Sequence, residues 1–531
     1  MAEQTIDDSE LGPQETKADG DRTQTPPPPS GKPIQAATAL GMGNSSSSPF
    51  ADAAKALPPV KPLNLLLVVL AAIGADIALR MPGPSLAGSL SLMLVLALIL
   101  TSRPTFGDDG EGRLGLAASV LVVGLSSILA LRTSPWVTGT TIPAVLGLLV
   151  LIATDGLNPG RPWPWLRSTV LSAESLGVVF PWSTLSIRRA MGEQVHNLSK
   201  FVRIAAIVIL VVLALGGLLA SGDAVFASVF TIEGLGPLVS HLSLVAVLIV
   251  PAAVVLVMAQ SGRTYASDPF GLESGPNSDE SGRFIVESRA AVWAVAVVLS
   301  LWCVVQVVVI SGGAEAALDA QGLSPAEYAR RGFFQLVAAA ALSLTVLNVA
   351  HRLGHREHQP EPGQRIPVSV TCLVLGVLIV ITYSRLWYYV ETFGLTMLRL
   401  SVATFLVWLA TMTAISFARS FGVGAGVNWL PPAAVLSAGF IILAFGAINP
   451  EGFVASTNLG RTTESEKVDV SYLRTLSDDA KPTIEAFDWS QHGGQPQSIT
   501  RLLCAKPAST KYGLFSWNMS RYERPDSCPN P

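Results

Sequence analysis

The chain has 531 residues, of which 50% are hydrophobic and only 14% are charged, against roughly 25% charged residues in a soluble globular protein. Its mean hydropathy is +0.48, and its formal net charge of −3 is too small to indicate a strongly acidic or basic partner. These values exclude a nucleic-acid-binding protein, a disordered chain and an ordinary soluble enzyme. They predict an all-α, polytopic integral membrane protein whose main solvent is the lipid bilayer.

Residues 1–62 contain a run of prolines at 26–29, a run of serines at 45–48 and scattered acidic residues, without an apolar period. A segment of this composition cannot bury enough apolar surface to offset the entropy lost on ordering. We therefore expect residues 1–62 to form a disordered cytoplasmic tail rather than a signal peptide.

Residues 63–448 contain apolar segments that are long enough to cross about 30 Å of hydrocarbon. The eleven candidate spans are 63–79, 86–101, 114–131, 137–154, 201–221, 235–259, 290–311, 332–350, 366–384, 394–418 and 430–448. The first two are joined by only a few residues, so we expect them to form a tight hairpin.

The distribution of basic residues predicts the direction of threading. With the N-terminus in the cytoplasm, fifteen lysines and arginines fall in or beside inside loops and five fall in outside loops, as the positive-inside rule requires. An odd number of spans then places residues 449–531 outside the cell membrane as a small, mainly helical domain. Cys504 and Cys528 are its only cysteines, and an oxidising exterior would let them pair.

Asp76 lies near the outer end of the first candidate span, and Arg80 follows one helical turn later. An ionisable group inside a bilayer is a functional candidate because it is costly unless it is paired or hydrated. We favour an interfacial i,i+4 ion pair that ends the helix. The alternative is an acidic residue of a membrane-embedded, lipid-linked transferase, which requires Asp76 to be exposed in a groove.

A segment rich in aromatic residues and arginine precedes the candidate span 394–418, and Arg399 lies about two turns inside that span. A guanidinium group at this depth needs a partner or water. An outward polar pocket and an interfacial aromatic belt with snorkelling arginines are both consistent with the pattern. The candidate pocket residues are Glu327, Arg330, Arg331, Arg385, Tyr388, Glu391 and Arg399.

Two segments that we expect in the cytoplasm give weaker indications of function. His351, His355 and His358 would share one face of a continuing helix, but the neighbouring arginines favour a juxtamembrane basic collar over a metal site. We therefore expect no metal there. Residues 169–191 are predicted to form a helix in the headgroup layer, broken at Pro181.

Three segments resemble the bacterial membrane-protein family named domain of unknown function 4173, related to 4153. The first is 322–336 and the second runs from Tyr383 through Gly394-Leu395-Thr396 to Arg399. The third contains Asn449-Pro450, Asn458, Asp469, Tyr472-Leu473, Ser477-Asp478-Asp479-Ala480 and Pro482, with Trp517-Asn518 and Ser520-Arg521 near the end. Ser456-Thr457 stand before Asn458, where the family has Arg-Tyr. The resemblance implies a polytopic fold without an assigned activity, and it adds weight to the outward pocket.

Three classes of function are consistent with the sequence. Because phosphate-loop, zinc-protease and nucleophile-elbow motifs are missing, we expect a non-enzymatic envelope sensor or assembly partner that acts through its outer face. The alternatives are a transporter of a small, anionic solute and the lipid-linked transferase. The expected partners are the lipid bilayer and an envelope protein, with no nucleic acid and no cofactor.

Overall fold

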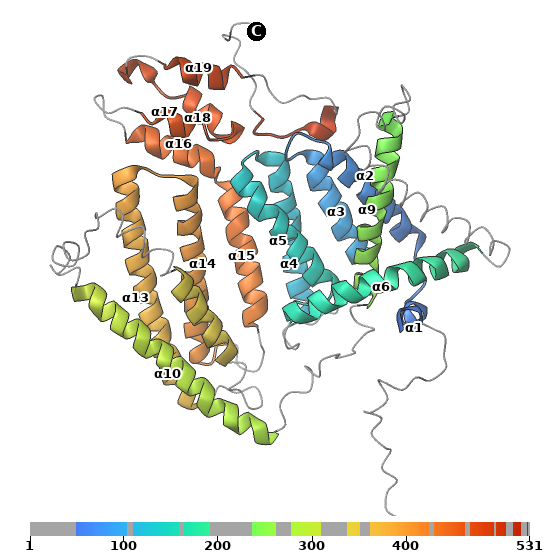
Figure 1. The fold of residues 1–531 in the computed structure, drawn as a ribbon, viewed down its shortest axis with the longest axis horizontal. Coiled ribbons are helices and arrows are strands. Elements are labelled where there is room, and N and C mark those ends of the chain that lie inside the picture. Colours follow the sequence, from blue (N-terminus) through green and yellow to red (C-terminus); the bar gives the residue numbers. More distant parts are fainter. Residues whose placement is uncertain are drawn as a thin grey trace, which may run out of the picture. The chain divides into compact units, whose positions relative to one another are not determined.

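The computed structural model describes residues 49–102, 110–158, 164–191, 236–261, 278–308, 337–350, 362–423, 429–461, 468–492, 495–505, 513–521 and 528. Every regular element in these residues is a helix (Figure 1). The long helices are α2 (Pro62–Leu79), α3 (Leu86–Ser102), α4 (Gly110–Leu131), α5 (Pro135–Ala153), α6 (Pro164–Met191), α9 (Gly236–Ser261), α10 (Ser278–Val308), α13 (Pro362–Phe393), α14 (Met397–Ser420) and α15 (Leu430–Ala447).

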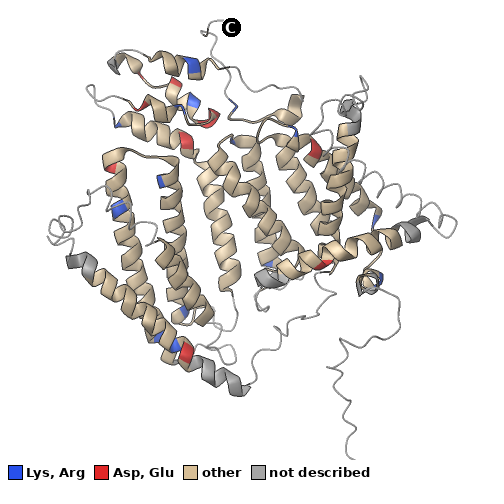
Figure 2. Cartoon of the chain, viewed as in Figure 1, with Lys and Arg blue, Asp and Glu red and all other residues tan. Residues whose placement is uncertain are grey.

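Within the described residues, eight helices are long and apolar enough to cross a membrane. Leu86–Ser102 and Val337–Ala350 are apolar but shorter. The candidate span 201–221 lies outside the described residues, so a total of eleven spans stays a prediction. Figure 2 shows long uncharged stretches along the described helices, with Lys, Arg, Asp and Glu mostly near helix ends and in the C-terminal residues.

Helices α2 to α5 alternate in direction, and so do α13 to α15. The C-terminal ends of α2, α4, α13 and α15 meet the N-terminal ends of α3, α5, α9 and α14 on one side of the bundle. Hydrogen bonds join these ends to one another or to residues after Ile448. This side is called the C-terminal side below.

Two apolar cores hold the helices together. One contains buried side chains of α2 to α6 and α9, and the other lies between α10, α13, α14 and residues 337–350. Helix α15 contacts α4, α5 and α14, and so joins the two groups. Gly446 permits this packing, because a Cβ atom there would lie 2.9 Å from Ile128 Cγ2.

Two of the expectations from the sequence were wrong, one for residues 1–62 and one for residues 169–191. The tail is not unstructured up to residue 62, because α1 (Pro49–Ala56) packs against α6. Phe50, Ala53, Ala54 and Leu57 have the i, i+3, i+4, i+7 spacing of an apolar helix face, and the last three are buried. Helix α6 also continues through Pro181 instead of breaking there.

The residues after Ile448 that the structure describes form a set of short helices, called the C-terminal region below. They are α16 (Pro450–Gly460), α17 (Val470–Leu473), η3 (Asp478–Ala480), α18 (Lys481–Glu485), η4 (Trp489–His492), α19 (Gln497–Leu503) and η5 (Gly513–Ser516). Its apolar side chains, including Leu473, Ile484 and Ile499, form one cluster with Ile128 of α4 and Val137 of α5. The C-terminal region therefore shares its core with the ends of the apolar helices.

Candidate functional site

The turn between α13 and α14 contains the motif Gly394-Leu395-Thr396. Gly394 adopts φ +79°, a left-handed conformation that glycine reaches without a Cβ penalty, and its N–H donates to Val390 O at 2.9 Å. Thr396 is the N-cap of α14, since its side chain accepts from the Arg399 N–H at 3.3 Å. One helix therefore ends and the next begins within four residues.

Arg399 lies in the first turn of α14, so its expected position two turns inside the span was wrong. Its Nη1 donates to Phe393 O at 3.1 Å and to Gly394 O, and its Cζ lies 4.4 Å from the centroid of the Tyr389 ring. Arg461 donates to carbonyl groups of the same helix end. The two cations thus satisfy the terminal carbonyl groups of α13 and oppose its negative dipole end.

The other candidate pocket residues are only partly brought together. Within the described residues, Arg399 forms no ion pair with Glu391, whose carboxylate instead accepts from Trp387 Nε1 at 2.7 Å. Tyr388 is exposed and Arg385 is half-buried. Glu327, Arg330 and Arg331 lie outside the described residues, as do His351, His355 and His358. The outward pocket therefore stays a prediction, and its central arginine has a structural role.

Side chains of the C-terminal region form hydrogen bonds with the main chain at the α13–α14 turn. Asn458 of α16 accepts from Leu395 N and donates to Leu395 O, both at 2.7 Å. The Tyr472 hydroxyl accepts from Met397 N at 2.8 Å. Burial raises the pKa of the Tyr472 phenol above its ordinary value of 10.0, so the hydroxyl is neutral at physiological pH.

Two buried carboxylates join the C-terminal region to the turn between α4 and α5. Glu451 and Asp479 are each 2% exposed. Asp479 Oδ1 accepts from Thr133 N at 2.8 Å and from Thr133 Oγ1 at 2.7 Å, and its Oδ2 accepts from Ser134 N at 3.0 Å. Glu451 accepts from Ser134 Oγ at 2.7 Å and from Ser477 N at 2.5 Å. All four carboxylate oxygens thus have hydrogen-bond donors, as buried charges require.

Asn449 fixes the start of α16 beside these carboxylates. It has φ 52°, and its side chain accepts from Gly452 N at 3.1 Å while donating to Asp479 O at 2.9 Å. Asparagine tolerates the left-handed conformation better than most residues. Its position before Pro450 therefore both begins the helix and binds the Asp479 main chain.

Asn518 and Arg132 donate to carbonyl groups at the ends of α4 and α15. Asn518 Nδ2 donates to Leu129 O at 2.9 Å and to Arg132 O at 3.0 Å. Arg132 in turn donates to Gly446 O at 2.9 Å and to Ala447 O at 2.8 Å. Carbonyl groups at the ends of α4 and α15 therefore receive side-chain donors.

A second cluster joins α2 to α9. Asp76 is 2% exposed; its Oδ1 accepts from Arg80 Nε at 2.9 Å, and its Oδ2 lies 2.5 Å from His241 Nδ1. Arg80 also donates to Ser240 O at 2.7 Å. The predicted Asp76–Arg80 ion pair is confirmed. Because the carboxylate is buried and both oxygens are occupied, the requirement of the transferase alternative is not met.

Sequence reasoning did not single out His241 or Glu451. His241 is isolated in an apolar segment, and its partner Asp76 is 165 residues away. Glu451 follows Pro450 and reads as an ordinary acidic residue in a first helical turn, although its partner Ser134 is 317 residues away. The one available signal was that each is an ionisable residue in or beside an apolar helix.

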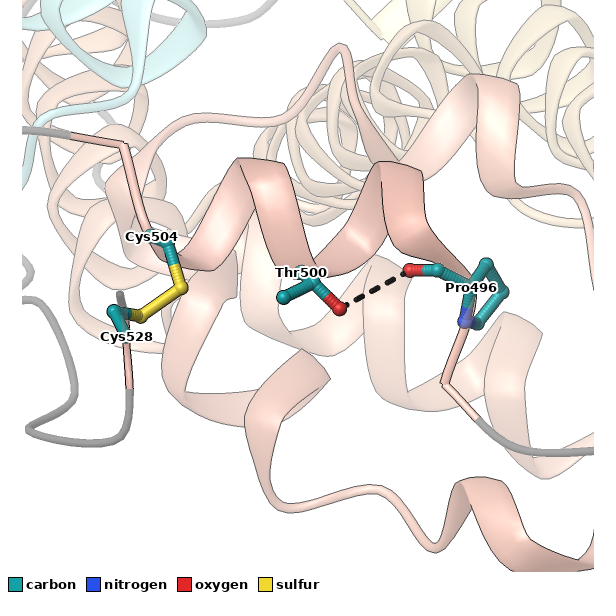
Figure 3. The surroundings of a disulfide bond; sticks show 4 residues. All are labelled: Pro496, Thr500, Cys504 and Cys528. Atoms are coloured by element: carbon teal, nitrogen blue, oxygen red, sulfur yellow. Dashed lines mark hydrogen bonds between the residues drawn. A yellow bond between two sulfur atoms is a disulfide. The ribbon is translucent and has the colours of Figure 1, made fainter. Parts of the chain in front are cut away.

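Cys504 and Cys528 are joined by a disulfide bond with a Cα–Cα distance of 5.5 Å. Figure 3 shows the bond at the C-terminal end of α19, whose Thr500 Oγ1 donates to Pro496 O. Cys303 and Cys372 are free thiols in α10 and α13. The disulfide ties residue 528 to a helix that is part of the shared core.

Comparison with known proteins gives one match. The family model described as "Domain of unknown function (DUF4153)" matches residues 117–487. No curated protein matches the chain, and no solved structure matches it. The matched interval contains the α13–α14 turn and both buried carboxylates, but neither Asp76 nor residues 513–521.

Proposed function

The chain belongs to the DUF4153 family, and we propose that it is a non-enzymatic, multi-pass protein of the bacterial cell membrane that acts through its C-terminal region as an envelope sensor or assembly partner. The observation that carries this proposal is the pairing of Glu451 and Asp479 with the α4–α5 turn. These carboxylates serve attachment rather than catalysis. The attached region then presents its remaining surface as one fixed platform.

The side of the membrane is part of the proposal. The bias of basic residues toward the opposite loops favours an outward C-terminal region, and the Cys504–Cys528 disulfide is of the kind that persists in oxidising compartments. The N-terminus is then cytoplasmic. The resemblance to the related family 4173 also belongs to the proposal, because the family match concerns DUF4153.

The surface available to an envelope protein is polar. Between residues 468 and 505, no large apolar side chain that the structure describes is exposed. The exposed residues there include Arg474, Thr475, Glu485, Ser490, Thr500 and Arg501. Such a surface suits a hydrated, non-obligate contact better than a permanent apolar interface.

The transporter alternative has less support. It needs Arg399 and Arg385 to bind an anionic solute, but Arg399 donates to Phe393 O and Gly394 O and lies over Tyr389. The transferase alternative needs an accessible Asp76, and that carboxylate is buried between Arg80 and His241. Neither alternative therefore replaces the proposed role.

Site-specific photocrosslinking in living cells tests the proposal. A photoreactive amino acid at Thr475 or Arg501 is expected to give a discrete adduct with one envelope protein, and Arg474→Glu should reduce the Thr475 adduct. Phe421, which is exposed at the opposite end of α14, is the matched control position. Adducts that arise equally at Phe421, or none at either position in a protein of normal abundance, would contradict the proposal.

A further inference from the structure

Residues 513–521, called the C-terminal strap below, differ from the rest of the C-terminal region in their surface. Leu514 is 72% exposed, Phe515 47%, Trp517 47% and Met519 70%. Four large apolar side chains within six residues form an exposed patch, which marks an interaction surface on most proteins. Elsewhere in the described C-terminal region, Phe453 of α16 is the one large apolar side chain that is exposed, so this concentration is specific to the strap.

The strap is fixed against the ends of the apolar helices by main-chain contacts. Leu86 N donates to Trp517 O at 2.9 Å, and Met519 N donates to Ala130 O at 2.9 Å. Asn518 Nδ2 additionally approaches Pro84 O at 3.3 Å. The strap therefore lies where α2 ends, α3 begins and α4 ends, which is the depth at which a bilayer changes from hydrocarbon to headgroups.

The neighbouring helices continue the same apolar surface. Leu79 at the end of α2 and Leu90 in the first turns of α3 are exposed, and α3 contacts η5. In a bilayer, exposed leucines on apolar helices are the side chains that contact lipid. The strap adds large apolar and aromatic side chains at the edge of that lipid-facing surface, where Trp is enriched in membrane proteins.

We propose that the C-terminal strap inserts into the bilayer leaflet on the C-terminal side. Leu514, Phe515 and Met519 reach the boundary with the acyl chains, and Trp517 lies among the headgroups. The occupant of the apolar patch is lipid, and protein contacts are left to the polar surface. This inference goes beyond the proposed function and needs neither the partner nor the side of the membrane to be known.

The anchoring pattern explains why the apolar side chains point outward. Ser516 and Asn518 alternate with the exposed residues and are buried. The side-chain amide of Asn518 donates to Leu129 O and Arg132 O at the end of α4. Ser516 ends the short helix η5 and Asn518 follows it, so these two buried polar residues hold the strap to the helix ends while its large apolar side chains stay exposed.

Spin-label accessibility in the full-length protein tests the insertion. Met519→Cys is labelled in a background carrying Cys303→Ala and Cys372→Ala, with the Cys504–Cys528 disulfide intact, and the protein is reconstituted in phosphatidylcholine/phosphatidylglycerol nanodiscs. The label at Met519 is expected to collide more with dissolved oxygen, which partitions into lipid, than with a water-soluble nickel chelate. Thr475→Cys, exposed on the polar surface, should show the reverse preference.

Two outcomes would overturn the proposal. A label at Met519 with the same chelate preference as Thr475 would put the strap in water. A label protected from both reagents would mean that protein, such as a second copy of the chain, covers the patch. If Met519→Cys does not fold, Leu514→Cys carries the same test, because its side chain is the most exposed of the four.

Discussion

Asn458 binds the main chain of Leu395 on both sides, accepting from its N–H and donating to its carbonyl at 2.7 Å each. The pair joins α16 to the α13–α14 turn across 63 residues of sequence. An amide side chain is suited to this contact because it offers one donor and one acceptor in a single plane. The side chains of Ser456 and Thr457, which precede Asn458, bond only to Phe453 O of their own helix and take no part in this contact.

Asn458→Ala should destabilise the protein by about 1–3 kcal/mol, because it removes two hydrogen bonds and leaves two main-chain groups without partners. Thermal unfolding in detergent micelles measures the change. Thr457→Ala is the matched control, since Thr457 bonds only the carbonyl of Phe453 in its own helix. Equal effects of the two substitutions would contradict the role assigned to Asn458.

Asp479→Ala should cost about 3 kcal/mol or more, because the loss of a buried carboxylate leaves Thr133 N and Ser134 N unpaired. The exposed Asp488 of the same region bonds Ser490, and Asp488→Ala should cost less than about 1 kcal/mol. Limited proteolysis of the purified protein should release the C-terminal region faster in the first variant only. Similar proteolysis of both variants would argue against attachment through Asp479.

Asp76 and His241 should be energetically coupled. A double-mutant cycle with Asp76→Ala, His241→Ala and the double substitution should give an interaction free energy of about 1 kcal/mol, since contacting residues rarely act additively. Heat denaturation in the same detergent provides the four stabilities. Strict additivity would indicate that His241 does not bind Asp76 in the membrane protein.

The raised pKa of Tyr472 should make the protein less stable at alkaline pH. Its folded-state pKa is raised by burial above the ordinary 10.0, so its contribution is fully present below pH 10 and is lost as the pH rises through the folded-state value. Tyr472→Phe should be less stable at neutral pH by about 1 kcal/mol, because Met397 N loses its acceptor. It should also lose less stability than the wild type above pH 10. Parallel pH profiles would refute this assignment.

The apolar segments predicted the helices well because burial in lipid is a local property of the sequence. The candidate span 430–448 and α15 (Leu430–Ala447) nearly coincide, and the same holds for 63–79 and α2 (Pro62–Leu79). The ends of helices that run into polar or aromatic segments were harder to predict. Helix α13 continues to Phe393, through an aromatic run predicted to lie beyond the span, and only the positive φ of Gly394 ends it.

The contacts of the candidate site could not be predicted, because their partners are distant in sequence. Asp479 binds Thr133 across 346 residues, and no local pattern specifies that pairing. Arg399 was assigned to a pocket because a guanidinium in a span needs a partner. Its partners proved to be carbonyl groups at the end of α13, which depend on turn geometry rather than on composition.

Cysteine labelling in intact cells tests whether the C-terminal region lies outside the cell, as we propose. In a background carrying Cys303→Ala and Cys372→Ala, Arg474→Cys and Phe421→Cys mark opposite ends of the bundle, and both parent side chains are exposed. A membrane-impermeant maleimide on intact cells should label Arg474→Cys at once, and Phe421→Cys only after permeabilisation. Labelling of Phe421→Cys alone in intact cells would contradict the account.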